Sequence, residues 1–515
     1  MELAEEQQQN NKRTTDLTTR PLLGKIILFA LPLMLTSLLQ LLYNAADLIV
    51  VGQWTGDTAM AAVGSTGALI NLIVNLFIGL SVGALSVTAR YIGAKKDGKV
   101  SRTVHTAISI SVLSGFIVGV IGFFISKQIL KWMNTPGDIL SQSALYLKIY
   151  FCGMPVNLLY NFGASILRAS GDTRRPLLIL GTAGLLNVGL NILTVAGLRM
   201  GVAGVGIATV ASQAVSAVGV VAFLSKKKDA TRFSFKKLRI HRAELFEILR
   251  MGIPAGVQGI CFSISNVIIQ SSINGFGEAA VAGNASAGNL EGFVYVSMNA
   301  VAQACLTVVG QNYGAAKTKN IDLTLMQCLL LAAGIGLAVG SIVLAAGKPL
   351  LRFYGCTEDG IRYGVQRMRF ICIWYFLCGM MDVFAGAMQG MGRSLMPMLV
   401  TLFGACVFRV IWVFTVFRWR PTFFILMLSY PVSWLLTLTI HSICLIALRR
   451  KIYARLAAAQ GPAAGETAPE ITPDAEPAPQ TGEAASQTAP MQSGAVEETE
   501  PVSISETEGE KHDLN

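Results

Sequence analysis

The first residue with the potential for ion chemistry is Asp47, a carboxylate near the end of the apolar stretch Lys25–Val51. Asn44 precedes it by three residues, so the two side chains would share one face of a helix. A charge in an apolar stretch of this length is costly unless it faces a polar cavity or a partner. Two interpretations stay open, namely an interfacial acid that reaches headgroup water and a cation or proton site inside a helix bundle.

Three more ionisable residues lie inside apolar stretches of the second half, namely Glu291, Asp382 and Arg409. At ~1.5 Å per helical residue, Asp382 lies ~12 Å and Arg409 ~21 Å from the inner ends of their stretches. A long Arg side chain can close that gap, so Asp382 is either half of a structural ion pair with Arg409 or a substrate-binding acid. Glu291 has no partner evident in the sequence, which favours contact with a cationic substrate or a proton.

Other chemistries find no support in the sequence. The four His form no HExxH, no GxSxG is present, and the nine Cys form no CxxC or Cys/His cluster. Residues 93–100, GAKKDGKV, imitate a phosphate-binding loop, but Val100 stands where Ser or Thr is needed and no strand precedes it. We therefore expect neither an enzyme nor a cofactor, and no metal beyond a possible sodium ion at Asp47.

The elements that must position these residues are membrane spans. The 515 residues are 53% hydrophobic and only 14% charged, with a mean hydropathy of +0.55, whereas soluble domains carry about 25% charged residues. This composition predicts an all-α polytopic membrane protein. Twelve apolar segments follow one another, at residues 24–51, 58–88, 101–126, 142–168, 175–198, 203–225, 245–273, 279–308, 321–347, 361–390, 395–417 and 421–449.

Loop charges predict the orientation. Lys and Arg on alternate sides number 28 on the side of the N-terminus and 11 on the other, so the positive-inside rule places both termini in the cytoplasm. Five of the 11 lie between Lys348 and Arg369, against this trend. The net charge of +11 is thus attributed to cytoplasmic loops and not to nucleic-acid binding.

Five parts are expected along the chain. Residues 456–515 hold 12 acids and one Lys, and such a polar tail cannot bury a core. Residues 1–20 are polar and lack a signal-peptide pattern, so the first span is retained. The predicted parts are a cytoplasmic N-terminal tail (1–20), an N-terminal six-helix lobe (21–225), a cytoplasmic link (226–244), a C-terminal six-helix lobe (245–451) and a disordered acidic tail (452–515).

The two lobes repeat each other. At an offset of 221 residues, Gly and Pro recur in identical positions, and with one small gap Asn44 stands opposite Asn266. Six spans per half give both halves the same sense in the membrane, so their pseudo-two-fold axis runs along the membrane normal, with a substrate site near their interface. The matched pairs are Gly56/Gly277, Ser65/Ser286, Gly67/Gly288, Gly93/Gly314, Gly171/Gly392 and Pro176/Pro397.

Several motifs resemble one transporter family. LPLMLTSLLQLLYNAADLIVVGQWTG, GALSVTARYIGAKKDG and ILRASGDTRRP in the first half, with MGIPAGVQGICFSISNVII and VVGQNYGAAKTKN in the second, resemble the multidrug and toxic compound extrusion (MATE) transporters. The resemblance covers roughly residues 20–450. It implies two lobes that alternate between outward- and inward-facing states and export amphipathic, often cationic, compounds against inward flow of sodium ions or protons.

The resemblance also implies a coupling site in the N-terminal lobe, formed by Asp47, Asn187, Asn191 and Thr209. Asn191 departs from the family, which often has Asp there, so the choice between sodium and proton stays open. Counted from the outer helix ends, Asp47, Asn191 and Thr209 lie ~6, ~10 and ~9 Å deep and share a layer, while Asn187 lies ~16 Å deep. A coupling Glu used by another branch of the family falls here on Phe262 and is not carried over.

We therefore predict a cation-coupled antiporter in the plasma membrane. One alternative is a lipid-linked oligosaccharide flippase of the same superfamily, which would need an Arg- and Lys-lined cavity. Another is a membrane scaffold or receptor that uses the acidic tail. The expected partners are small organic compounds and the lipid bilayer, without nucleic acid, and the chain is expected to be monomeric. Candidates for lining the substrate cavity are Asn44, Asn161, Asn266, Glu291 and Asp382.

Overall fold

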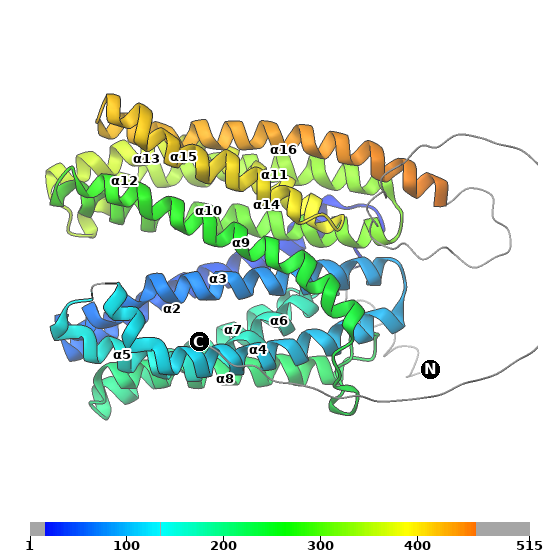
Figure 1. Cartoon of the computed structure of the whole chain (residues 1–515), viewed down its shortest axis with the longest axis horizontal. Helices are drawn as coiled ribbons and strands as arrows, with labels where there is room; N and C mark the ends of the chain where they lie inside the picture. The colour runs from blue at the N-terminus through cyan, green and yellow to red at the C-terminus, as the bar shows by residue number, and fades with distance from the viewer. Residues whose placement is uncertain (1–15, 134, 460–515) are drawn as a thin grey trace, which may run out of the picture. The chain divides into compact units, whose positions relative to one another are not determined.

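The computed structural model describes residues 16–133 and 135–459, and every regular element in these ranges is a helix (Figure 1). Eleven of the described helices are long and apolar enough to cross a membrane. The first half contains α2 (Leu23–Thr55), α3 (Asp57–Gly93), α4 (Asp97–Trp132), α5 (Gly137–Cys152), α6 (Met154–Ala169), α7 (Arg174–Asn191) with the π-helix η1 (Ile192–Gly197), and α8 (Gly201–Lys226).

The second half follows a link that holds the short 3₁₀ helix η2 (Phe235–Lys237). Its elements are α9 (Arg242–Asn274), α10 (Glu278–Gly314), α11 (Thr318–Ala345), α12 (Gly347–Phe353), α13 (Glu358–Gly390), α14 (Leu395–Thr401), η3 (Leu402–Val407), α15 (Phe408–Trp412), η4 (Val413–Phe417) and α16 (Phe423–Ala459). The segments α14, η3, α15 and η4 run on as one span, Leu395–Phe417.

The fourth predicted span is bent into α5 and α6. Gly153 lies at the break, and Pro155, which has no backbone N–H, stands at the start of α6. A side chain at Gly153 would overlap Val210 of α8, so the glycine lets the bend pack closely against that helix. With this bent span, twelve spans are present and form two six-helix lobes, α2–α8 and α9–α16 (Figure 1). We call the end of the bundle where α2 begins the proximal end and the end where α2 finishes the distal end.

The internal repeat is visible in the backbone. Positive φ angles recur at the 221-residue offset, with 87° and 91° at Gly56 and Gly277, and 55° and 54° at Lys95 and Ala316. Glycine tolerates such angles at no steric cost, which explains the identity of the first pair. The second pair shows that the loop geometry is retained where the residue types differ.

Small residues let the lobes meet. Gly79 and Gly83 of α3 lie against Gly252 and Gly256 of α9, and a Cβ atom at Gly79 would overlap the backbone of Gly256. Backbones at this distance gain van der Waals contact that larger side chains would prevent. The two helices are therefore held together along their proximal halves by direct backbone contact.

The segment that precedes α2 docks on the opposite lobe. Asn312 Nδ2 donates to the carbonyl of Leu17 at 2.9 Å, and Asn320 Nδ2 donates to that of Thr18 at 3.0 Å. Leu17 and Leu22 are fully buried in a cluster with residues of α10, α11 and α16. The sequence analysis assigned residues 1–20 to a polar tail, whereas residues 16–20 pack against the second lobe. Residues 1–15 and the acidic tail beyond Ala459 lie outside the described residues.

Candidate functional site

The polar residues of the first lobe meet in its distal third. Asn191 Nδ2 donates to Asp47 Oδ1 at 2.5 Å and lies 3.2 Å from Asn187 Oδ1. Asn191 is completely buried and Asn187 is 5% exposed. One turn separates the two Asn residues on α7, which is why they share a face, and α2 brings Asp47 against that face. The structure thus brings these three residues into one hydrogen-bonded group.

Asn191 lies directly before an irregular stretch of helix. It is the last residue of α7 before the π-helix η1, and a π-helical turn shifts the side chains that follow it and is frequent at functional sites. Thr194 within η1 donates its hydroxyl to the carbonyls of Leu190 and Gly204, at 2.8 and 3.1 Å. These bonds tie η1 to α8 and stabilise the local distortion.

Two oxygens near Asp47 are buried without a partner. Thr209 of α8 interacts with the Asp47 carboxylate, yet its Oγ1 reaches hydrogen-bond geometry with no described residue, and the same is true of Asn191 Oδ1. A buried oxygen without a partner is costly. One carboxylate beside two neutral oxygens suits a monovalent cation, or a proton on the acid, because hard cations prefer oxygen ligands.

Tyr146 of α5 is a neighbour of this site that the sequence did not single out. It is 7% exposed and interacts electrostatically with Asp47. It packs in a cluster that also holds Val50 and Val195, from α2 and η1. An aromatic residue in an apolar span gives no signal of its own, so only the packing of α5 beside α2 reveals it.

In the second lobe, Glu291 is paired, which corrects the expectation that it has no partner. Arg367 of α13 contacts it through Nε at 3.0 and 3.1 Å and through Nη2 at 2.7 Å. The side chains of Glu291 and Arg367 are 4% and 12% exposed. Arg367 was counted with the outer loop because it lies near the start of its span, but α13 begins at Glu358 and carries Arg367 inside the bundle.

The ion pair of Asp382 with Arg409, one of the two alternatives that the sequence left open, is absent from the described part of the chain. Arg409 Nε donates to Ser433 Oγ at 2.9 Å, and its guanidinium lies 4.3 Å from the centre of the Tyr430 ring. The Arg409 side chain therefore turns toward α16, where an aromatic face attracts the cation. The Arg409 side chain is long enough to reach toward Asp382, but it points in another direction.

Asp382 instead belongs to a polar chain that reaches the other lobe. Its side chain interacts with Asn299 of α10. Asn299 Oδ1 accepts from Gln303 Nε2 at 2.8 Å, and Gln303 Oε1 accepts from Arg168 of α6 at 3.1 Å. The chain joins an acid of the second lobe to a cation of the first.

The remaining cavity candidates are dispersed. Asn161 donates to the backbone and side chain of Asn157, at 2.9 and 3.0 Å, within α6. Asn266 is exposed on α9. Asn44 lies in α2, and its side chain is outside the described part of the structure. No two of these three residues are joined by a described contact.

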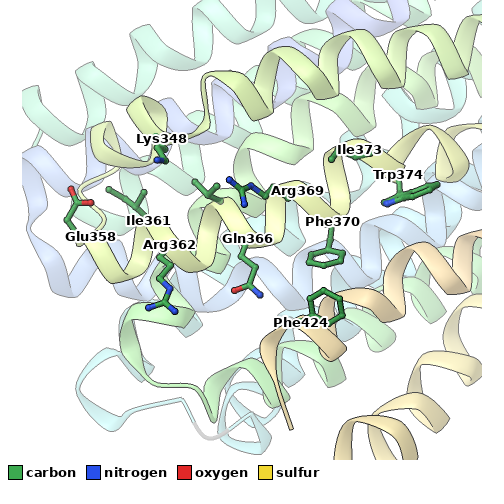
Figure 2. A pocket seen from close by; sticks show the side chains of 11 residues that line it. Lys348, Glu358, Ile361, Arg362, Gln366, Arg369, Phe370, Ile373, Trp374 and Phe424 are labelled. Carbon is green, nitrogen blue, oxygen red and sulfur yellow. The ribbon is translucent and has the colours of Figure 1, made fainter. Parts of the chain in front are cut away.

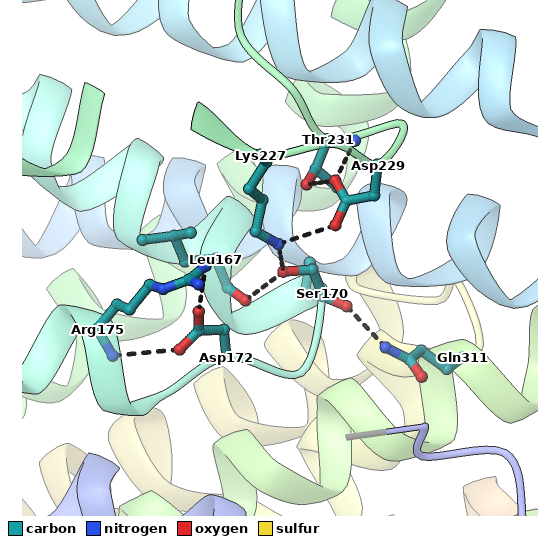
Figure 3. A network of polar contacts seen from close by, with 9 residues as sticks. Leu167, Ser170, Asp172, Arg175, Lys227, Asp229, Thr231 and Gln311 are labelled. Atoms are coloured by element: carbon teal, nitrogen blue, oxygen red, sulfur yellow. Dashed lines mark hydrogen bonds and ion pairs between the residues drawn. The ribbon is translucent and has the colours of Figure 1, made fainter. Parts of the chain in front are cut away.

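A polar network closes the proximal end (Figure 3). Lys227 Nζ donates to Ser170 Oγ at 2.6 Å and pairs with Asp229 at 3.2 Å. Burial lowers the pKa of Lys227, against the opposing effect of Asp229. Burial acts to raise the pKa of Asp229, but Lys227 and Thr231 outweigh it and hold that pKa below its usual value. From the other lobe, Gln311 Nε2 donates to the carbonyl of Ala169 at 2.8 Å.

All described hydrogen bonds between the lobes lie toward the proximal end. Ser86 Oγ donates to the carbonyl of Gln389 at 2.7 Å, and Tyr91 donates to Glu247 Oε1 at 2.6 Å. Two matched lobes of membrane helices, joined at one end and holding buried acids, are typical of a membrane transporter. The comparisons with known proteins agree with this class.

A sequence profile described as MatE matches residues 32–193 and again residues 254–415, so the same pattern occurs once in each lobe. The chain belongs to the MATE family, whose members are membrane transporters and not enzymes. It is similar to a protein named "Probable multidrug resistance protein YoeA" of Bacillus subtilis, with 27% identity over 384 residues, 73% of this chain and 83% of the relative.

Another similar protein is the "Probable multidrug resistance protein NorM" of Thermotoga maritima, which is 26% identical over 382 residues, 73% of this chain and 82% of the relative. Among solved structures, a MATE in a bent conformation superposes with a TM-score of 0.78 at 22% identity, over 86% of this chain and 99% of that one. A multidrug resistance MATE family transporter in an outward-facing conformation gives 0.78 at 23% identity, with the same coverage. These structures share the fold.

Proposed function

We propose that the protein is an antiporter of the plasma membrane that exports amphipathic, cationic organic compounds and is driven by inward flow of protons or sodium ions through the Asp47 site. The observation that carries the proposal is the Asp47 carboxylate with two buried oxygens beside it, on Asn191 and Thr209, for which the described residues supply no hydrogen bond of good geometry. No described cation neutralises Asp47. A group that binds and releases a cation needs such unfilled oxygen ligands.

The contacts between the lobes support alternating access. The lobes are bonded toward the proximal end and not, among the described residues, in their distal halves, as expected for a transporter with its distal side accessible. Both termini are proximal in the predicted topology, so the distal side would be the outside of the cell. The related proteins with multidrug resistance in their names support organic compounds as cargo.

The contacts of the cations Arg367 and Arg409 argue against the flippase alternative. A cavity for a pyrophosphate group would need unoccupied cations. Here Arg367 is held by Glu291, and Arg409 lies against Tyr430 and Ser433. Asp382 has no described ion-pair partner, so it is the acid that we propose for contact with a cationic substrate.

The test is efflux of a fluorescent lipophilic cation from proteoliposomes under an imposed proton or sodium gradient. The wild-type protein should transport under at least one gradient, and transport under neither would contradict the proposal. Asp47→Asn keeps the shape but removes the charge, so it should fold normally and lose gradient-driven efflux, by about tenfold or more.

The matched control is Asp138→Asn, the same chemical change at an exposed acid of the same lobe, and it should transport like the wild type. Asn191→Asp restores a second carboxylate and should be tolerated, with cation binding equal to or tighter than that of the wild type. Wild-type efflux in Asp47→Asn would place the coupling elsewhere, first of all at Asp382.

A further inference from the structure

A pocket of about 730 Å³ opens at the distal end of the second lobe, on α13 beside the starts of α12 and α16 (Figure 2). Its lining joins two kinds of side chain, cations and large apolar groups. The residues used below are Lys348, Arg362, Arg369, Phe370, Trp374 and Phe424.

The pocket lies on the outer perimeter of the lobe. Arg362 and Arg369 are seven residues apart, so they share one face of α13. Arg367 and Gly364 lie on the opposite face, where they contact Glu291 and Gly283 of α10. Helix α10 packs on α2 and α3 of the other lobe, whereas α13 has only a minor contact with α3, at its proximal end. The pocket therefore faces away from the lobe interface, which in a membrane means that it faces lipid.

Three cations line the pocket, and the described residues give them no counter-ion. Lys348, Arg362 and Arg369 are all exposed, and none has an ion-pair or hydrogen-bond partner among the described residues. The one acid in the lining, Glu358, already pairs with Arg352 at 3.0 Å. Like charges that line one pocket without a counter-ion repel each other, so an anionic ligand would reduce this repulsion.

Aromatic side chains form the rest of the pocket wall that the argument uses. Phe370 and Phe424 meet edge to face with their ring centres 4.9 Å apart. Trp374 and Phe424 are 45% and 47% exposed. Phe370 and Trp374 follow the cations toward the middle of α13, a helix long and apolar enough to cross a membrane. Lys348 and Arg362 thus stand nearer the distal end than Phe370 and Trp374, in the order in which a phospholipid presents its headgroup and its acyl chains.

We propose that this pocket binds an anionic phospholipid of the distal leaflet. Its phosphate would lie among Lys348, Arg362 and Arg369, and one acyl chain would lie against Phe370, Trp374 and Phe424. The inference uses the membrane embedding of the family and is independent of the coupling site. It also accounts for the cluster of cations at the end where the positive-inside rule predicts few.

The experiment is native mass spectrometry of the full chain in detergent, with equimolar phosphatidylglycerol and phosphatidylcholine. The wild type should retain phosphatidylglycerol in preference. The double variant Arg362→Gln/Arg369→Gln should lower that preference on the order of tenfold, since each cation near a membrane surface contributes to anionic lipid binding. The matched control is Arg418→Gln/Arg420→Gln, which removes two exposed cations at the same end of the same lobe, outside the pocket.

If the control variant still prefers phosphatidylglycerol and the pocket variant does not, the site is supported. An equal loss in both variants would show general surface attraction and overturn it. Competition by inorganic phosphate, with no preference between the two lipids, would identify a free-anion site and overturn the lipid assignment. Melting curves of both variants without added lipid check that folding is unchanged, and Lys348→Gln serves as a milder variant if either is unstable. Efflux by the pocket variant should persist, so a failure of the lipid-site proposal can be told apart from a failure of the antiport proposal.

Discussion

Single residues balance the buried charge of the two lobes in different ways. The first lobe holds Asp47 with neutral amide and hydroxyl neighbours only. The second holds a neutralised pair, Glu291 with Arg367, and separately the acid Asp382, which has no ion-pair partner among the described residues. A charge that must bind and release a cation cannot have a permanent counter-ion, whereas a structural charge requires one. We therefore assign Glu291 a structural role and leave Asp47 and Asp382 as the acids that can exchange partners.

The paired role of Glu291 can be measured. Arg367→Met should lower the free energy of unfolding by about 3–5 kcal/mol, because it leaves a buried carboxylate alone. Adding Glu291→Gln should recover most of this loss. Thermal unfolding in detergent is the readout. The control Arg352→Met breaks an exposed pair and should cost at most about 1 kcal/mol. A double variant no more stable than Arg367→Met would refute the pairing.

At this scale the sequence predicted which residues are unusual but not all of their partners. An acid inside an apolar span is conspicuous in any sequence, so Asp47, Glu291 and Asp382 were found directly. Arg367 was not, because a cation near a span end is normally interfacial. Arg409 was found, but its aromatic partner Tyr430 lies on another helix, and side-chain direction between helices is not encoded in spacing along one of them.

At the scale of elements, the crossing of α3 and α9 is a close backbone contact between the lobes. Gly79 of α3 meets the backbone of Gly256, and Ser86, on the proximal side of this contact, is completely buried against Gln389. If the lobes separate here during transport, anything that pushes α3 from α9 favours the state that opens proximally. A single methyl group is enough, because packed backbones leave no room for it.

Gly79→Ala should therefore expose Ser86. In a Cys-less background, we expect the maleimide labelling rate of Ser86→Cys to rise on the order of tenfold when Gly79→Ala is added, as overpacking costs about 1–3 kcal/mol. Gly64→Ala is the matched control on the same helix, since a Cβ atom there meets nothing within 4 Å. Unchanged labelling in a folded Gly79→Ala protein would show that this contact does not gate access.

The positions of the spans were predicted closely from the sequence, but the π-helical turns within them were not. Hydropathy is sufficient to place a span because lipid requires about 20 apolar residues, and α9, for example, covers the predicted segment 245–273. The π-helices η1 and η4 leave no such signal, because a changed hydrogen-bond register alters neither composition nor length. Asn191 was placed only to within the same layer as Asp47, and the turn into η1 completes the contact.

At the scale of the whole molecule, the proximal closure ties the N-terminal segment, the interlobe link and both lobes together. Leu17 docks on the second lobe through Asn312, and Lys227 in the link joins Ser170 of the first lobe to Asp229. Opening the proximal end must break such contacts. The polar character of most of them lets water replace each bond at modest net cost, which suits a closure that is made and broken in every cycle.

The orientation of this closure in the membrane is the last prediction. With Arg367 inside the bundle, the imbalance of loop cations that places the proximal end in the cytoplasm becomes stronger. Residues 225–229 are a poor place to test it, because Lys227 is buried and would resist labelling from either side. Lys237 in the link and Thr55 at the end of α2 are both exposed, so accessibility depends on sidedness alone. In a Cys-less background on intact cells, a membrane-impermeant maleimide should label Thr55→Cys and leave Lys237→Cys unlabelled, while permeabilised cells should label both. Labelling of Lys237→Cys alone in intact cells would reverse the orientation, and with it the direction of transport proposed for the Asp47 site.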